Sequence, residues 1–433
     1  MNKLINLLLL IFIVFLSIQR NAYCRTDYSL HDLIKLANTQ SETIKIAEDD
    51  LDIARQEEKR ALSVLVPRAS AYGSHTEYKE DAVTSPDTQS IGVKLTQSFT
   101  LNGKELIALD VTRRTIESKE LSLETIRSQY ILQVAQAYYN ILSARKFFEI
   151  AQSDVERLTS HRNAVKEKLS VGNVTKTDLF RAEAELSKAL TEQKKAENAI
   201  LQTKAALQNL VDIDQEFELQ KQDSAEIENF QCSLEEIQDY AIKNRTEVKE
   251  AKKNLDIAAK TVTFKKSDYW PTVELEGGYR ETDVQYDARP TSVKYDTEDT
   301  YFTGSIVFTL FDGGLRRATI RQALLDQKKA EKALTLQEKR ITLDSKVSFL
   351  DYETAKSTLH NLKDELKYAE ETYNAVQMQF NYGMADSIDI MDANTLLVSA
   401  QRRISDAQYK YYLSVLKIIY TKGDLTGFFL KEA

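Results

Sequence analysis

Apolar residues near the start of the chain recur at the spacing of an amphipathic helix. Between residues 29 and 66 they follow one another at intervals of three, four and seven positions, the period of a helix that buries one stripe. A second stretch, which begins at Ser233, repeats the same intervals. Each stretch opens with a serine and an acid three residues later, the pattern of a capping box. The two stripes are Leu30, Leu33, Ala37, Ile44, Ala47, Leu51 and Ala54, and Leu234, Ile237, Ala241, Val248, Ala251, Leu255 and Ala258.

The hydrophobic period changes at a proline that follows each of these helices. From the proline onward, polar and apolar residues alternate, which is the pattern of a strand. We therefore expect a β-hairpin over 67–101 and another over 271–311, with the polar segments 82–90 and 285–299 as their loops. Strands of ~10–12 residues have the length that crosses an outer membrane when they are tilted.

A long stretch without glycine or proline follows each predicted hairpin. These stretches run from about residue 104 to 169 and from about 315 to 382, and each predicts a helix ~100 Å long. Each ends at a glycine, after which a return helix is expected over 176–210 and over 387–421. The remaining segments, 211–232 and 423–433, are expected to be irregular.

Glycine and proline mark every predicted junction. The 433 residues include only 12 glycines and 4 prolines, so there are few turns and the elements between them must be long. The residues expected to form structural turns are Pro67, Pro271, Gly103, Gly313, Gly172 and Gly383.

The order of these elements is the same in the two halves of the chain, because the sequence is an internal duplication. Similar residues recur in matching order, with a few more residues inserted in the second copy. We assign 25–232 to the first repeat and 233–433 to the second, each built as helix, hairpin, long helix and return helix. Matched positions include Leu51-Asp52-Ile53-Ala54 with Leu255-Asp256-Ile257-Ala258, and Gly172, Asp178, Ala182 and Leu186 with Gly383, Asp389, Ala393 and Leu397.

Composition narrows the function classes. The formal charge is −8 and no basic stripe occurs along the chain, so nucleic acid is not an expected partner. No serine–histidine–aspartate set, P-loop or dinucleotide fingerprint is found, and the four histidines are scattered. We therefore expect neither an enzyme nor a metal site, and no cofactor.

The first 24 residues have the pattern of a secretory signal peptide. Lys3 precedes an apolar run, Leu7 to Leu16, that is too short to cross a bilayer as a helix. Small residues at Ala22 and Cys24 predict cleavage after Cys24. The alternative is that Cys24 becomes an acylated N-terminal anchor.

Sequence motifs at the expected turns carry a family resemblance. Leu169-Ser170-Val171-Gly172 precedes Asp178, and Phe380-Asn381-Tyr382-Gly383 precedes Asp389 and Asp392. Together with Phe311-Asp312-Gly313-Gly314 after a strand, they make the chain resemble the TolC-type outer-membrane efflux proteins. The resemblance covers essentially the whole mature chain, and it is specific because two motif copies occur in the right order.

The resemblance implies a mainly α fold with a membrane β-barrel. Three protomers would each give four strands to one 12-stranded barrel in outer-membrane lipid, on a long α-helical coiled-coil tunnel in the periplasm of a Gram-negative bacterium. This homotrimer would passively export solutes delivered by an inner-membrane pump through a periplasmic adaptor protein, in efflux or in type I secretion. The rival interpretation is a periplasmic coiled-coil adaptor or scaffold without a pore, against which the paired alternating strands argue.

The resemblance also assigns roles to three acidic residues. Asp389 and Asp392 match a channel-facing pair at the periplasmic tip, where threefold symmetry would place six carboxylates around a cation-selective constriction. The alternative is that both only favour the helix dipole as first-turn acids, and the two effects can coexist. Asp178 matches a position that holds the tip closed through inter-helix hydrogen bonds. Ala385 and Phe380 depart from the family pattern, which predicts that the closed state is held differently or less tightly.

Overall fold

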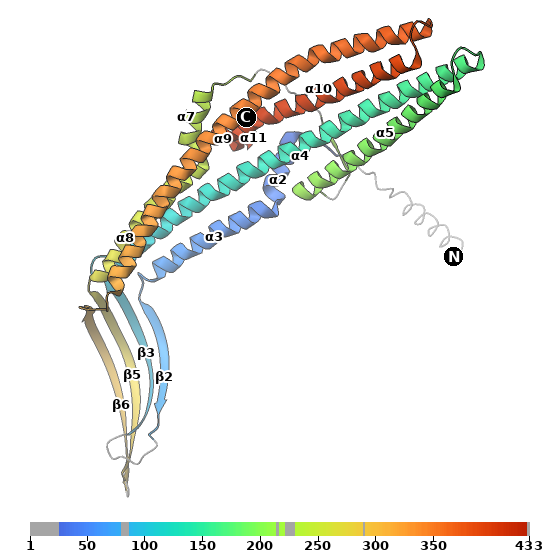
Figure 1. Cartoon of the computed structure of the whole chain (residues 1–433). Helices are drawn as coiled ribbons and strands as arrows, with labels where there is room; N and C mark the ends of the chain where they lie inside the picture. Colours follow the sequence, from blue (N-terminus) through green and yellow to red (C-terminus); the bar gives the residue numbers. More distant parts are fainter. Residues whose placement is uncertain (1–25, 79–85, 214–215, 221–229, 289–290, 431–433) are drawn as a thin grey trace, which may run out of the picture. The chain divides into compact units, whose positions relative to one another are not determined.

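The computed structural model describes residues 26–78, 86–213, 216–220, 230–288 and 291–430 (Figure 1). The predicted signal peptide, including Cys24, lies outside these residues. By its contacts the chain forms two compact units: one from Met1–Ile44, Arg127–Gln238 and Asp344–Ala433, the other from Lys45–Ile126 and Asp239–Leu343. Each unit therefore takes segments from both sequence repeats.

The helix expected over 29–66 is two helices, α2 (Leu30–Gln40) and α3 (Glu42–Ser63). The capping box at Ser29 forms as predicted, with Asp32 as its acid. The break falls at Ser41, whose ψ of 122° is not helical and whose hydroxyl accepts a hydrogen bond from the Ile44 amide (3.4 Å). The prediction of one helix was wrong. The apolar stripe keeps its spacing across the break, so the sequence pattern does not reveal that the helix is interrupted.

The second repeat has the same interruption. Helix α7 (Leu234–Asn244) is followed directly by α8 (Thr246–Lys266), and Arg245 between them has a ψ of 130°. A break at the matching place in both repeats supports the internal duplication that the sequence predicts.

Four antiparallel strands form one sheet in the order β2-β3-β5-β6 (Figure 1). Strand β2 (Arg68–Thr76) pairs with β3 (Asp87–Thr100), β3 pairs with β5 (Thr272–Ala288), and β5 pairs with β6 (Thr291–Val307). Both expected hairpins are therefore present within a single sheet.

Strands β5 and β6 are longer than predicted, and the loop expected at 285–299 is wrong. Both strands have 17 residues, so only 289–290 separates them, and those two lie outside the described residues. The physical reason is a weak alternation hidden among polar residues: Val284 faces Tyr295 and Tyr286 faces Val293 across the strand pair. In the first hairpin, 87–90 of the expected loop 82–90 belongs to β3, and 79–85 lies outside the described residues.

The very long helices match the prediction closely. Helices α4 (Lys104–Ser170) and α9 (Leu315–Asn381) each contain 67 residues. The return helices α5 (Lys176–Val211) and α10 (Ser387–Lys422) each contain 36 residues. No helix in the described part of the chain is long and apolar enough to cross a membrane.

The main hydrophobic core lies within the first unit, and tyrosines supply much of it. Tyr138 and Tyr139 of α4 pack edge to face at 5.3 Å, and Tyr412 of α10 lies 5.8 Å from Tyr139. Such aromatic pairs contribute about 0.5–1.5 kcal/mol beyond the area that they bury.

The segments expected to be irregular contain short elements that close this core. Strand β4 (Phe217–Leu219) lies in the first of these segments and pairs in parallel with β1 (Thr26–Tyr28), and α11 (Leu425–Leu430) lies in the second and follows α10. The hydroxyl of Tyr138 donates to the carbonyl of Gln220 (2.6 Å), which fixes the connector against α4. Three-residue strands are too short to show a period, so the sequence did not predict them.

Candidate functional site at the helix turns

Two turns of the first unit have the same backbone geometry. At the first, Gly172 has a φ of 80° and the Asn173 amide donates to the Lys168 carbonyl (2.9 Å). At the second, Gly383 has a φ of 76° and the Met384 amide donates to the Gln379 carbonyl (2.8 Å). This is the Schellman ending of a helix, which requires a left-handed residue and therefore favours glycine.

A capping box begins the helix that follows each turn. Before α5 the Thr175 hydroxyl accepts from the Asp178 amide (3.3 Å), and the Asp178 carboxylate accepts from the Thr175 amide (2.8 Å). Before α10 the Asp386 carboxylate accepts from the Asp389 amide (3.0 Å), and the Asp389 carboxylate accepts from the Asp386 amide (2.9 Å). Both turns are therefore closed by local hydrogen bonds.

The structure places the hydrogen bonds of Asp178 within its own turn. Its carboxylate accepts from the Thr175 amide and from the Thr175 hydroxyl (2.8 Å each), and these bonds lower the pKa of Asp178 below its usual value. The inter-helix role that the resemblance implied for Asp178 is not visible within this protomer, where its partners are local.

The two acids expected at the constriction are both exposed to solvent in the protomer. The Asp389 carboxylate takes part in the capping box, whereas the Asp392 carboxylate has no hydrogen-bond or ion-pair partner among the described residues. Both lie in the first two turns of α10, three residues apart, so they share one helix face. Asp389 therefore combines a capping role with a surface charge, and Asp392 contributes charge alone.

A buried histidine of α4 contacts the second turn. His161 Nε2 lies 2.9 Å from the Ser387 hydroxyl, the two residues are 7% and 3% exposed, and the His161 ring lies 5.1 Å from the Phe380 ring. His161 Nδ1 is buried without a hydrogen-bond partner among the described residues. Burial lowers the pKa of His161, and the nearby charge of Lys168 lowers it further, so the neutral ring is favoured.

Two more side chains of α4, Lys168 and Arg157, also contact α9 or α10, and together with His161 they form the α4 cluster. Lys168 places its ammonium group 3.7 Å from the centre of the Phe380 ring and donates to the Phe380 carbonyl. Arg157 donates to the side-chain oxygen of Asn394 (2.8 Å), and the Asn394 amide donates to Asp154 (2.6 Å). These contacts join α4 of the first repeat to α9 and α10 of the second.

Sequence reasoning missed this cluster, although it left a signal. His161 follows Leu158 by three residues and precedes Val165 by four, so it occupies the buried stripe of α4. The four histidines are scattered along the chain, so metal-ligand spacing does not single out His161. Among the described residues no group of three or more potential metal ligands is present.

The remaining predicted turn residues lie in the second unit, where the sheet meets the helices. Pro67 and Pro271 immediately precede β2 and β5, while Gly103 (φ 70°) and Gly313 (φ 68°) precede α4 and α9. Each therefore stands at a change of secondary structure.

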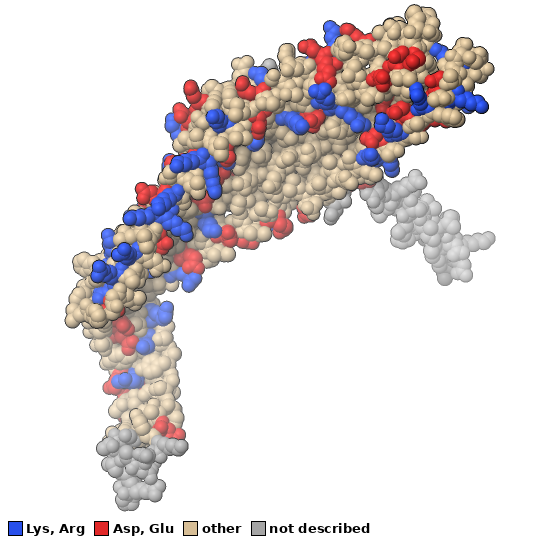
Figure 2. Space-filling view, viewed as in Figure 1, with Lys and Arg blue, Asp and Glu red and all other residues tan. Residues whose placement is uncertain are grey.

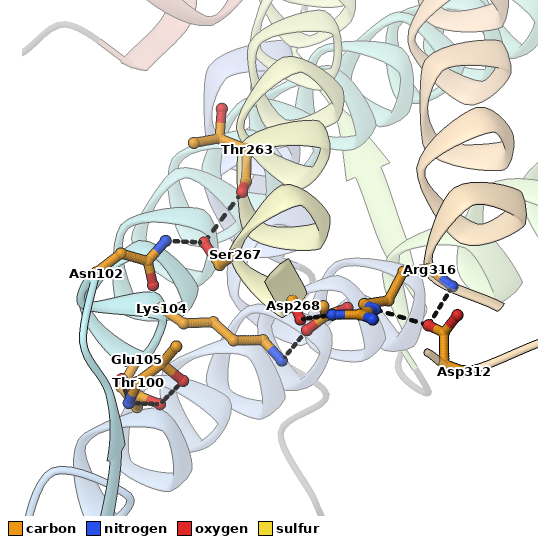
Figure 3. Close-up of polar contacts among 9 residues, drawn as sticks. All are labelled: Thr100, Asn102, Lys104, Glu105, Thr263, Ser267, Asp268, Asp312 and Arg316. Atoms are coloured by element: carbon orange, nitrogen blue, oxygen red, sulfur yellow. Dashed lines mark hydrogen bonds and ion pairs between the residues drawn. The ribbon is translucent and has the colours of Figure 1, made fainter. Parts of the chain in front are cut away.

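Side chains reinforce these junctions (Figure 3). Glu105 accepts from the Thr100 amide (3.0 Å), Lys104 pairs with Asp268 (2.5 Å), and Asp312 pairs with Arg316 (2.7 Å). Asn102 donates to the Ser267 hydroxyl (2.7 Å), which ties the first hairpin to the end of α8. The junction is thus fixed by residues from both repeats.

Comparison with known proteins matches this architecture to one family. The model of the outer membrane efflux protein family matches residues 33–211 and 238–419. The chain is 21% identical over 415 residues to the outer membrane protein TolC of Escherichia coli, covering 92% of this chain and 82% of that protein. It is also 21% identical over 297 residues to the proteases secretion protein PrtF of Dickeya chrysanthemi, covering 64% and 62% of the two chains.

A solved structure of CusC superposes with a TM-score of 0.79 at 15% identity, over 92% of both chains. That degree of identity establishes a shared fold, whereas the family match rests on the sequence itself.

Proposed function

We propose that this chain, which belongs to the outer membrane efflux protein family, is the outer-membrane channel component of a tripartite efflux or type I secretion system. The observation that carries the proposal is the two-faced sheet. One face bears exposed apolar side chains such as Phe302 (76% exposed) and Ile306 (70%), while the other bears polar and charged ones. A sheet that is apolar on one face and polar on the other is suited to lipid outside and water inside.

The channel is a homotrimer with a 12-stranded barrel. The four-stranded sheet leaves one edge of β2 and one edge of β6 without a partner among the described residues. Unpaired edges are not tolerated in lipid, and four strands cannot enclose a pore. If β2 of each copy pairs with β6 of the next, three copies leave no strand edge unpaired and provide enough strands to enclose a pore.

Apolar stripes on the helices support the same assembly. Helix α9 exposes Leu336, Leu343 and Leu350 at heptad spacing (51%, 61% and 51% exposed), and α3 exposes Ile46 and Ile53 (64% and 61%) at the same spacing. A heptad seam without a partner in the protomer is typical of a coiled coil between subunits.

The channel passively conducts solutes that an inner-membrane pump hands over through a periplasmic adaptor, and it carries out no catalysis. Efflux is the function named by the family model, and protein secretion is the function named for the relative PrtF. Both uses require only a conduit.

The acids at the second turn form the constriction of this conduit. Asp389 and Asp392 are exposed on one face of α10, and Asp392 has no partner among the described residues to neutralise it. Threefold symmetry would gather six such carboxylates, which attract cations and repel anions.

Mass measurement of the purified protein in detergent, together with planar-bilayer recording, tests the proposal. We expect three chains per particle and discrete ion-conducting steps. A particle of one or two chains, or membranes that never conduct, would reject it in favour of a scaffold without a pore.

A further inference from the structure

The register of the sheet assigns every strand residue to one of two faces. One face, here the apolar face, carries Val93 and Leu95 of β3 opposite Tyr279 and Gly277 of β5. The opposite face, here the polar face, carries the alternating residues. Its members with charged or aromatic side chains in the middle of the sheet are Arg68, Tyr72, Lys94, Glu274, Glu276, Arg280, Asp299 and Tyr301.

The charges on the polar face cancel. Within the described strands this face holds three basic residues and three acidic ones. On the other face, beyond the apolar rows, the acids Glu281, Asp283, Asp296 and Glu298 outnumber the one lysine of the described strands there, Lys294, which pairs with Asp283 (3.4 Å) and Asp296 (3.8 Å). Figure 2 shows that both signs of charge are interspersed over the visible helices, whereas the visible sheet surface is mostly uncharged. The six charges of the polar face are Arg68, Lys94, Arg280, Glu274, Glu276 and Asp299.

Four of these six charges are paired across neighbouring strands. Lys94 of β3 donates to Glu276 of β5 (3.0 Å), and Arg280 of β5 lies 3.5 Å from Asp299 of β6. The hydroxyl of Tyr301 donates to the second oxygen of Glu276 (2.9 Å), and Arg280 lies over the Tyr301 ring at 5.6 Å. The pairs are joined through Tyr301 into one network across β3, β5 and β6.

Two glycines let the tyrosines lie flat on the sheet. Tyr301 is directly opposite Gly278, and a Cβ at that glycine would stand 2.9 Å from the Tyr301 hydroxyl oxygen. Tyr72 is directly opposite Gly92, where a Cβ would stand 3.0 Å from the Tyr72 hydroxyl oxygen. The rings therefore occupy space that a side chain would fill, and this holds the Tyr301 hydroxyl at Glu276.

We propose that these paired charges line the lumen of the channel and keep it charge-compensated, so that the barrel admits solutes of either sign and leaves ion selection to the helix turns. The inference rests on the proposed channel. Three protomers multiply the pairs without adding net charge. A water-filled lumen with neutral walls neither concentrates nor repels ions, whereas one uncompensated charge per protomer sets up a potential that does.

Removal of one partner at a time tests this proposal. Glu276→Gln leaves Lys94 uncompensated and is expected to lower the cation-to-anion permeability ratio by about twofold at low ionic strength, where screening is weak. Lys94→Gln is expected to raise the ratio by a similar factor, and the double variant to restore the wild-type value. The reversal potential under a salt gradient measures each ratio.

Glu281→Gln is the matched control, because it removes the same charge from the same strand on the opposite face. It is expected to leave the reversal potential unchanged. The proposal is overturned if Glu276→Gln and Lys94→Gln both leave it unchanged, or if Glu281→Gln shifts it as much as Glu276→Gln does. A wild-type protein that does not conduct would instead reject the channel itself.

Thiol labelling keeps the test valid if these variants fail to assemble. In a Cys232→Ser background, Ser70→Cys introduces a thiol on the polar face and Ala71→Cys introduces one on the apolar face. Small cationic and anionic thiol reagents that do not enter lipid are expected to modify position 70 at equal rates and to spare position 71. A strong preference for one sign at position 70, or labelling of position 71 alone, would refute the compensated lumen.

Discussion

The turn after α4 and the turn after α9 share a backbone design but differ in charge. Each has a left-handed glycine, a Schellman ending and a capping box that opens a 36-residue helix. The first cap is Thr175 and the second is Asp386, and the position of α5 that matches the exposed Asp392 of α10 is occupied by Arg181. Duplication has thus preserved what the backbone requires, while the side chains that no turn geometry constrains have diverged.

The surroundings of the two turns differ as well. His161, Lys168 and Arg157 all lie on α4, yet each contacts a residue of α9 or α10. The second turn is therefore supported by the other repeat through polar contacts that include a titratable group. This asymmetry leads to four tests, each of which compares the second turn with the first.

The largest expected difference is in ion selectivity. Asp389→Asn and Asp392→Asn together remove two charges per protomer, and we expect the cation preference in bilayer recordings to fall several-fold because a narrow mouth is poorly screened. Asp178→Asn removes the capping-box acid of the first turn and serves as the control, with no expected change. An equal loss in both variants would mean that the two turns do not differ in function.

The two glycines are expected to behave alike. Gly172→Ala and Gly383→Ala each force an L-residue into the left-handed region, at a cost of roughly 1–2 kcal/mol of local stability. Nothing lies within 4 Å of an added Cβ at either position, so backbone strain is the whole effect. Hydrogen exchange of the turn amides measures it. A much larger cost at one glycine would show that its turn is held by contacts outside the protomer.

Substitution of the N-cap residue is expected to reduce local stability by different amounts at the two turns, and this difference is smaller than the effects above. Thr175→Ala removes the side-chain acceptor at the start of α5 and should cost about 1 kcal/mol, whereas Asp386→Asn keeps an equally good cap and should cost only a few tenths. Exchange rates in the first turns of α5 and α10 give both values. If Asp386→Asn proved the more damaging change, the charge of Asp386, and not its hydrogen bond, would be what stabilises α10.

The smallest expected effect is a pH dependence of local stability, which is confined to the second turn. The pKa of His161 is lowered in the folded protein, so below the ordinary value of 6.5 the unfolded state binds more protons and stability declines as pH falls. Exchange around Phe380–Asp392 should therefore accelerate at mildly acidic pH more than exchange around Val171–Asp178. His161→Asn should abolish the difference. A response that persists in this variant would have to come from another group.

Much of this architecture could be predicted from the sequence, because long elements contain many periods. The two 67-residue helices, their glycine endings and the existence of both hairpins follow from periodicity and from the scarcity of glycine and proline. The breaks at Ser41 and Arg245 could not be predicted in this way, since one non-helical residue leaves the apolar stripe in register. The ends of β5 and β6 were missed because tyrosines and valines alternate there within a very polar segment.

The candidate site was predictable only in part. The positions of Asp178, Asp389 and Asp392 after left-handed glycines follow from the motifs, and Asp389 lies in the first turn of α10, where its carboxylate also accepts from the Asp386 amide. The support from His161 depends on a contact with Ser387, far away in the sequence, and no local pattern specifies that pairing.

The short parallel pairing of β1 with β4 has a consequence for how the chain folds. Residues Thr26–Tyr28 pair with Phe217–Leu219, from which they are separated in the sequence by nearly all of the first repeat. The entropic cost of closing such a loop grows only logarithmically with its length, but its closure must wait until that whole segment has been translocated. Within the first repeat, the earliest described residues are therefore among the last to gain their hydrogen bonds. In a chain truncated before residue 217, β1 would have no β4 with which to pair. The β1–β4 pair can therefore form only after nearly all of the first repeat has been exported.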